Sequence, residues 1–220
     1  MAAVNLAETV ATATSPRGEL HLRRRADGAL ELRVNGVFVM DDRETRSEEL
    51  LATAALAPQA DPGRLLVGGL GLGYTVRALL DDDRVRTVIV AEIEPELVRW
   101  MQDGLLPSVL DDPRVEIRVR DVRDAVLQQP DSSLDGILLD VDNGPGFLVY
   151  DANMAIYEQD FLGKCRQKLR PGGQLTVWSS SASEPLGEAV RGTFGACVVK
   201  RVPVELQGRD ETYYVYSAES

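Results

Sequence analysis

The chain has 220 residues, of which 44% are hydrophobic and 27% charged, a composition typical of an ordinary globular protein. Its formal net charge of -11 argues against non-specific nucleic-acid binding, which needs a basic face. No stretch approaches the roughly 18 apolar residues of a membrane span, and residues 1–15 lack the basic start and long apolar core of a signal peptide, so we expect a cytoplasmic protein.

The N-terminal residues 1–45 predict a small antiparallel β-meander. Residues 18–25 alternate between apolar and polar side chains and indicate a strand. Residues 29–40 form a second alternating stretch that Asn35-Gly36 divides, because Asn-Gly is a strong hairpin-turn dipeptide. A helix is expected next, over residues 47–56.

From Arg64 onward, short apolar strands alternate with helical patterns. The expected strands are residues 65–67, 87–91, 115–119, 136–139 and 174–178. The expected helices are residues 74–80, 95–103, 122–128 and 154–169, and residues 170–173 form a compact turn before the last of these strands. Such alternation predicts a parallel sheet with helices on both faces, which we assign to residues 46–220.

The end of the chain departs from this alternation. Residues 196–206 and 212–218 are both β-rich, and the short link around residues 207–210 leaves no room for a helix. They must pair as a hairpin, which places one antiparallel strand in the sheet. The order of elements resembles the class I methyltransferase fold, an α/β Rossmann-like fold with a mostly parallel seven-stranded sheet and an antiparallel terminal strand.

A glycine-rich loop follows the first strand of the sheet. Gly69, Gly71 and Gly73 stand at alternate positions, and glycine allows a backbone to bend sharply or to approach a ligand closely. Glu92, at the end of the next strand, completes a nucleotide-binding arrangement in which the acid binds ribose hydroxyls. The spacing differs from the G-x-G-x-x-G that surrounds a dinucleotide pyrophosphate, so we expect an S-adenosyl nucleoside rather than NAD.

Other candidates lie at the same edge of the sheet. Ile93 is placed to wall the adenine, Asp121 to accept a hydrogen bond from the adenine amino group, and Asp140 to line the mouth of the site. Each feature has a simpler explanation: a tight turn for the glycines, a helix N-cap for Asp121, a solvated surface acid for Glu92. Several such features at neighbouring strand ends favour a nucleotide site over turns and caps alone.

In combination, these motifs resemble the spermidine synthase family, aminopropyltransferases built on the methyltransferase fold. The family's V-E-I-D, D-P-R-V, G-D-G and L-K-P-G-G motifs correspond to residues 91–94, 112–115, 120–122 and 169–173. Its I-G-G-G-D-G-G loop corresponds to residues 67–73, with Val67 where ordinary methyltransferases carry an acid.

This resemblance covers nearly the whole chain. It implies that the protein binds S-adenosylmethionine, its decarboxylated form or methylthioadenosine, and that Val122 joins Asp121 at the nucleoside. It also implies a homodimer. No pattern for a metal site is present: Cys165 and Cys197 are far apart, which favours free thiols, and the single histidine, His21, lies in a predicted strand.

The departures from the family pattern fall among the motifs that bind the amine substrate and carry the catalytic acid. The family's D-S-S-D-P, whose second Asp receives the proton of the attacking amine, stands here as Asp140-Val141-Asp142-Asn143. Asn143 therefore occupies the catalytic position, and an amide cannot act as a base near neutral pH. Asp142, one position away, substitutes for it only if the loop backbone is rearranged. Our candidate catalytic residues are thus Asp140, Asp142 and Asn143.

The remaining substrate-site residues of the family are also altered. Its Tyr-His-Glu is replaced by Ser47-Glu48-Glu49, and its Gln falls among residues 38–40. Tyr157 alone matches a family aromatic, and we take it as a candidate substrate-binding residue.

These departures favour methyl transfer to an unknown small molecule, because a sulfonium leaving group is already activated and the protein mainly aligns the reactants. Aminopropyl transfer from decarboxylated S-adenosylmethionine to putrescine or another polyamine is the alternative, and a catalytically inactive nucleoside-binding protein is a second. An NAD-dependent oxidoreductase is disfavoured by the glycine spacing and the terminal hairpin. We expect no nucleic-acid or membrane partner.

Overall fold

The computed structural model describes residues 7–220; residues 1–6, which begin both the predicted meander and the stretch judged to lack a signal peptide, lie outside the described part. The N-terminal strands pair antiparallel in chain order as a four-stranded sheet: β1 (Glu8–Ser15), β2 (Gly18–Arg24), β3 (Leu30–Val34) and β4 (Val37–Asp41). Asn35 and Gly36 both adopt positive φ angles, 51° and 76°, as the predicted hairpin turn requires. The meander is confirmed, with β1 as an additional strand that the sequence analysis did not assign.

The second sheet has seven strands: β5 (Arg64–Gly68), β6 (Thr87–Glu92), β7 (Val115–Val119), β8 (Leu134–Leu139), β9 (Leu169–Ser179), β10 (Val198–Leu206) and β11 (Arg209–Glu219). Their spatial order is β10-β11-β9-β8-β5-β6-β7. The five strands from β9 to β7 pair in parallel, whereas β11 runs antiparallel to both β9 and β10. The predicted methyltransferase-type sheet and its terminal hairpin are confirmed.

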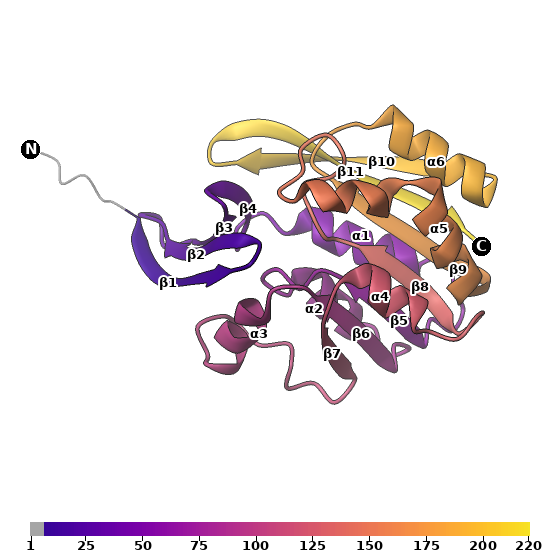
Figure 1. Ribbon diagram of the computed structural model, residues 1–220, viewed down its shortest axis with the longest axis horizontal. Coiled ribbons are helices and arrows are strands. Elements are labelled where there is room, and N and C mark those ends of the chain that lie inside the picture. Colours follow the sequence, from indigo (N-terminus) through magenta and orange to yellow (C-terminus); the bar gives the residue numbers. More distant parts are fainter. Residues whose placement is uncertain (1–6) are drawn as a thin grey trace, which may run out of the picture.

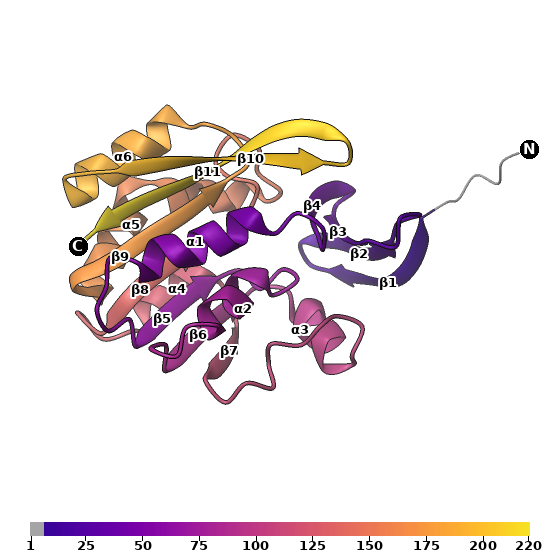
Figure 2. The ribbon, with the colours of Figure 1, turned by 180° about the vertical axis from the view of Figure 1, so that it is seen from behind.

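Helices cover both faces of this sheet (Figures 1 and 2). The elements α1 (Arg46–Leu56), α2 (Tyr74–Leu80) and α3 (Pro95–Gln102) pack in one apolar cluster, and α4 (Val122–Leu127), α5 (Gln159–Lys168) and α6 (Glu184–Phe194) in another. Alternate residues of β5 face the two clusters. Leu65 and Val67 pack in the cluster with α1–α3, and Leu66 packs in the cluster with α4–α6. Burial on both faces explains why these strands are continuous apolar runs.

Three details differ from the sequence prediction. The helix expected at residues 154–169 is a 3-10 segment, η1 (Asp151–Tyr157), followed by α5, because Glu158 between them is extended with φ -90° and ψ 154°. Residues 170–173, expected as a turn, belong to β9, where the pairing with β8 shifts register. Helix α6 was not predicted; Gly187 and Gly192 weaken its helical pattern, although Ser183 caps it.

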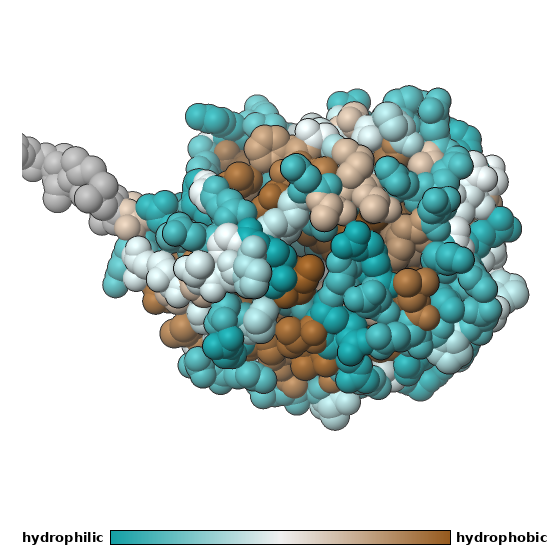
Figure 3. Space-filling view, viewed as in Figure 1, coloured by the Kyte–Doolittle hydropathy of each residue, from teal (hydrophilic) through white to brown (hydrophobic). Residues whose placement is uncertain are grey.

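The small sheet packs its apolar face onto the main body. Leu20, Leu22 and Leu32 belong to the same buried cluster as the side chains of α1 and α2. Figure 3 shows apolar surface gathered where the two parts meet. The division into domains at residues 45 and 46 stays a prediction. Among residues 7–220, no helix is both long enough and apolar enough to cross a membrane.

The chain order reverses between β5 and β8, since it moves outward to β6 and β7 before returning to β8. In open α/β sheets, ligands bind in the crevice outside the carboxyl ends of the strands at such a point. The loops after β5, β6, β7 and β8 all open at this edge, and β4 approaches it from the small sheet.

Candidate active site

The glycine loop after β5 is shaped by close backbone approach. Gly69 has a φ of 93°, and a Cβ added there would lie 1.9 Å from the backbone oxygen of Asp140. Gly71 has a φ of 50°, and its added Cβ would lie 2.6 Å from the sulfur of Met40. At Gly69 a side chain would require the backbone to move, whereas at Gly71 it would require the Met40 side chain to move.

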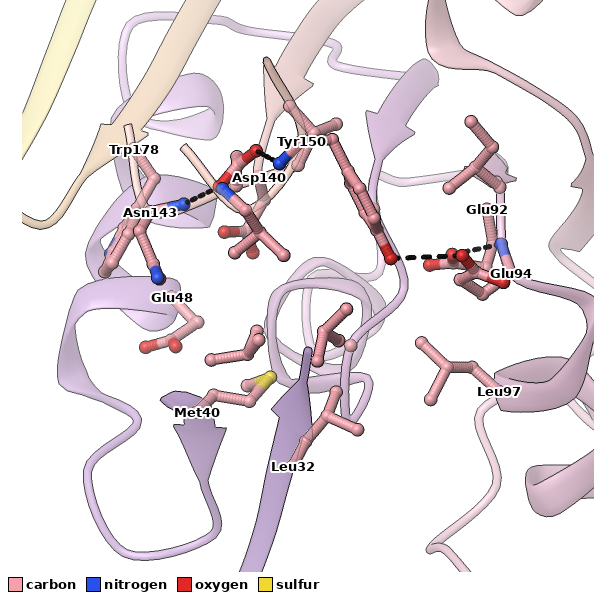
Figure 4. Close-up of a pocket in the computed structure, with 18 residues that line it drawn as sticks. Leu32, Met40, Glu48, Glu92, Glu94, Leu97, Asp140, Asn143, Tyr150 and Trp178 are labelled. Carbon is pink, nitrogen blue, oxygen red and sulfur yellow. Dashed lines mark hydrogen bonds between the residues drawn. The ribbon is translucent and has the colours of Figure 1, made fainter. Parts of the chain in front are cut away.

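Two adjoining pockets open beside this loop, and Figure 4 shows the larger of them. The larger is lined by Leu32, Val34, Val39, Met40, Glu48, Gly69, Gly71, Glu92, Ile93, Glu94, Leu97, Asp140, Val141, Asp142, Asn143, Val149, Tyr150 and Trp178. The smaller is lined by Gly69, Ala91, Glu92, Ile93, Asp121, Val122, Val141, Asn153 and Ile156. Because Gly69, Glu92, Ile93 and Val141 line both, the pockets form one continuous site.

Most of the candidate residues therefore meet at this site, but two do not. Gly73 lines neither pocket; it is the left-handed N-cap of α2, with Met101 and Val109 beside its α-carbon. Tyr157 also lines neither pocket, because it is buried in the apolar cluster on the α4–α6 face of the sheet. The structure gives Tyr157 a packing position rather than the predicted place at the substrate.

Glu92 is buried, with only 4% of its surface exposed, and is not a solvated surface acid. One carboxylate oxygen accepts a hydrogen bond from the backbone N–H of Leu70 at 2.8 Å, and the other from that of Glu94 at 2.7 Å. Burial raises the pKa of Glu92 above its usual value. The side chain thus ties the glycine loop to the end of β6 while it lines both pockets.

Substitution of Glu92 by alanine is expected to weaken nucleoside binding by about 1.5–3 kcal/mol, the range for a hydrogen bond to a charged group. The loss of the Leu70 N–H contact adds to this effect by loosening the loop. Calorimetry with methylthioadenosine measures the change, and an unchanged affinity would remove Glu92 from the nucleoside site.

Asp121 combines both roles that the sequence suggested. Its carboxylate caps α4 by accepting from the backbone N–H of Arg123 at 2.8 Å, and it also lines the smaller pocket. Burial acts to raise the pKa of Asp121, but the hydrogen bonds from Arg123 outweigh it and hold the pKa below its usual value. An ionised carboxylate at this position can accept a hydrogen bond from a ligand amino group.

The turn between β1 and β2 reaches over the site, which the sequence analysis missed. Arg17 donates from Nε to the Glu94 carboxylate at 2.7 Å and from Nη2 to the backbone oxygen of Ile93 at 2.7 Å. The Tyr150 hydroxyl donates to the same Glu94 carboxylate at 3.1 Å. These contacts fix the small sheet to the loops around the pocket. They join residues far apart in sequence, so no local sequence pattern predicts these contacts.

Asp142 holds the loop after β8 together. One carboxylate oxygen accepts from the backbone N–H groups of Asn143 and Val149, both at 2.7 Å. The other accepts from the backbone N–H of Tyr150 at 3.3 Å and the side-chain amide of Asn153 at 2.7 Å. The loop backbone is built around this carboxylate, and its four N–H donors leave it unavailable to a substrate. Asp142 is therefore not a substitute for the missing base.

Two other carboxyl groups lie in the pocket with fewer donors. Asp140, at the end of β8, accepts from the Thr75 hydroxyl at 2.6 Å. Glu48, in the first turn of α1, is 5% exposed and accepts from the Ser47 hydroxyl at 2.6 Å. Burial raises the pKa of both, and the Asp140 charge raises that of Glu48 further. In the sequence, Glu48 is only a departure from the family pattern. Its burial, which indicates a place in the pocket, is visible only in the structure.

Comparisons with known proteins agree with this geometry. No protein-family model matches the chain. It is 32% identical over 141 residues to polyamine aminopropyltransferase 2 of Pseudomonas aeruginosa, an alignment that covers 61% of this chain and 38% of that protein. It is 29% identical over 153 residues to the polyamine aminopropyltransferase of Nitrosomonas europaea, an alignment that covers 66% of this chain and 44% of that protein. The chain is thus similar in sequence to polyamine aminopropyltransferases.

Solved structures of spermidine synthases share the fold of this chain. A spermidine synthase in complex with the transition-state analogue AdoDATO matches 96% of this chain and 73% of its own, with a TM-score of 0.86 and 17% identity. The Thermotoga maritima spermidine synthase matches with a TM-score of 0.84 at 17% identity, over 96% of this chain and 72% of its own. The sequence alignments, by contrast, span less than half the length of the two curated relatives.

Proposed function

We propose that this protein transfers the aminopropyl group of decarboxylated S-adenosylmethionine to an amine acceptor. The observation that carries the proposal is the charge of the larger pocket. Glu48, Glu92, Glu94, Asp140 and Asp142 all line it, and its lining residues within the described chain include no lysine, arginine or histidine.

Such a pocket selects between the two forms of the nucleoside. Decarboxylated S-adenosylmethionine carries a sulfonium and an ammonium group, and an aliphatic amine is also a cation at neutral pH. S-adenosylmethionine carries an additional carboxylate, for which the residues lining the larger pocket offer no cationic partner, and unfavourable like-charge contacts cost several kcal/mol. The apolar lining from Leu32, Met40 and Leu97 suits the methylene groups of both reactants.

We assign the nucleoside to the smaller pocket and its junction with the larger one. Gly69 and Gly71 allow the backbone to approach the ligand, Glu92 accepts from the ribose hydroxyls, and Ile93 and Val122 enclose the adenine beside Asp121. Asp140, at the mouth, faces the transferred group. The protein binds and aligns the two reactants; the acceptor nitrogen bonds to the propyl carbon, and the carbon–sulfur bond breaks with its electron pair left on sulfur.

Methyl transfer, which the sequence analysis favoured, is the weaker hypothesis. It rested on the absence of an acid at Asn143 and on the loss of the family's substrate-site residues, yet the pocket holds other carboxyl groups. The curated relatives reported above are named for aminopropyl transfer. A cytoplasmic location and a homodimer stay predictions.

The direct test is product formation. The protein is incubated with putrescine and either decarboxylated S-adenosylmethionine or S-adenosylmethionine, and the products are separated by mass. We expect spermidine and methylthioadenosine from the decarboxylated donor, with kcat/KM at least roughly 100-fold above that for the other donor, since every ~1.4 kcal/mol is tenfold. A methylated amine formed from S-adenosylmethionine, with no spermidine in the parallel reaction, contradicts the proposal.

A further inference from the structure

An amine acceptor enters such a pocket protonated and must lose a proton before its nitrogen can attack. Asn143 stands where the resemblance places the acid for that step, and its side-chain amide donates to the backbone oxygen of Phe38 at 3.2 Å. Asp142 is committed to its four N–H donors. Neither residue offers a free carboxylate to the acceptor.

Two further carboxylates of the pocket are also committed. Glu92 accepts from two backbone N–H groups. Glu94 accepts from Arg17 at 2.7 Å, which makes it part of an ion pair, and from the Ser15 and Tyr150 hydroxyls. The Glu94 carboxylate is therefore already paired with a guanidinium from the small sheet.

Glu48 and Asp140 remain. Each accepts a single hydrogen bond from another side chain, a hydroxyl in both cases. Figure 4 shows both carboxyl groups facing the cavity on the side where Asn143 and Trp178 lie. The Trp178 indole N–H is buried there without a hydrogen-bond partner among the described residues. A buried donor without a protein partner is satisfied by an ordered water or by a ligand, so this N–H is available to whatever fills this end of the pocket.

We propose that Glu48 takes over the role of the missing acid: opposite Asp140, it binds the acceptor amine and accepts its proton. The inference rests on the proposed aminopropyl transfer. The Trp178 ring, beside Asn143, forms the aromatic wall of this end of the pocket, a surface that attracts an ammonium group.

The step is balanced in atoms and charge. The ammonium of the acceptor gives one proton to the Glu48 carboxylate, leaving a neutral amine and a carboxylic acid. The amine lone pair forms the nitrogen–carbon bond as the carbon–sulfur pair moves to the sulfonium, which becomes a neutral thioether. The product nitrogen keeps its two hydrogens and a positive charge, and Glu48 releases its proton to water when the products leave.

The groups around Glu48 suit this role. The ionisable groups close enough to interact electrostatically with Glu48 are Asp140 after β8, Glu44 before α1, Tyr74 at the start of α2 and Tyr213 in β11. All are acids or phenols, so among the described residues no cation in this set lowers the Glu48 pKa. Burial and the Asp140 charge raise the Glu48 pKa to about 8. The ammonium group of a bound acceptor favours the ionised form of Glu48, so the carboxylate can accept a proton near neutral pH.

The test compares Glu48→Gln with Glu49→Gln, an exposed neighbour on the same helix. We expect Glu48→Gln to lower kcat by roughly 100-fold or more, the usual contribution of a general base, while its affinity for methylthioadenosine stays that of the wild type. Its residual rate should rise about tenfold per pH unit from pH 7 to 9, as more acceptor is deprotonated in solution. Adding Asn143→Asp to Glu48→Gln should restore part of kcat. Glu49→Gln should behave as the wild type.

A Glu48→Gln rate within twofold of the wild type, with the wild-type pH profile, overturns the inference. If Glu48→Gln also loses methylthioadenosine binding, Glu48→Asp decides: a kcat at the wild-type value overturns the inference, and a kcat at least about tenfold lower with nucleoside affinity retained supports it.

Failure of the proposed function is distinguishable. If the wild type transfers no aminopropyl group, putrescine binding to the methylthioadenosine-loaded protein is measured by calorimetry. Loss of that binding in Glu48→Gln but not in Glu49→Gln supports the acceptor site at Glu48. Equal binding by both variants overturns it.

Discussion

Replacement of Gly69 by alanine is expected to lower the free energy of unfolding by at least about 2 kcal/mol and to abolish methylthioadenosine binding. Two effects add. A residue with a Cβ is strained at a φ of 93°, which costs roughly 1–2 kcal/mol. The new Cβ would also lie 1.9 Å from the backbone oxygen of Asp140, so β5 and the loop after β8 must separate. That separation opens the junction between the two pockets.

Gly172 provides the matched control. Its φ is 82°, similar to that of Gly69, but an added Cβ there meets nothing within 4 Å. Gly172→Ala therefore carries the backbone strain without the collision, and should leave nucleoside binding intact. Urea unfolding and calorimetry on both variants separate the two effects. Equal losses of stability in the two variants, with nucleoside binding retained, contradict the close approach at Gly69.

Replacement of Asp142 by alanine is expected to lower the free energy of unfolding by about 3 kcal/mol and aminopropyl transfer by more than roughly tenfold. The carboxylate is 8% exposed and satisfies four N–H donors. Buried donors left without a partner each cost about 1–3 kcal/mol, although water entering the loop recovers part of that cost. The loop carries Asn143 and Tyr150 into the pocket, so its release displaces both.

Asp151 is the control for Asp142, because it is an exposed acid on the segment that the same loop leads into. Asp151→Ala removes the same charge and should change stability by less than about 0.5 kcal/mol. Limited proteolysis adds a local readout: cleavage between residues 142 and 153 should accelerate only in Asp142→Ala. If Asp142→Ala loses activity but neither stability nor protease resistance, Asp142 acts in the chemistry rather than in the loop.

Local patterns were sufficient for most of the fold. The Asn35-Gly36 turn, the apolar runs of the parallel strands and the short link at residues 207–210 each restrict the backbone within a few residues. Strand β1 was missed because its alternation of threonine, alanine and valine is weak, and α6 because two glycines interrupt it. The 3-10 segment before α5 was missed because the break at Glu158, which is extended, has no glycine or proline to indicate it.

Of the candidate site, only the part that binds the nucleoside could be predicted from local patterns. The nucleoside half was recoverable, since Gly69, Glu92 and Asp121 each stand at the end of a strand and parallel strands bring such ends together. The acceptor half was not. Asp142 and Glu48 have the same kind of carboxyl group, and only their surroundings decide which one holds a loop and which one faces the cavity.

The amino-acid sequence by itself determined the sheet, its reversed terminal strand and the edge at which a nucleoside binds, because these follow from periodicity and turn chemistry over short distances. Only the tertiary structure decided the character of the pocket. Packing of the small sheet and α1 against the strand ends buries Glu48 opposite Asp140, and burial sets both the charge that a pocket attracts and the proton affinity of its acids.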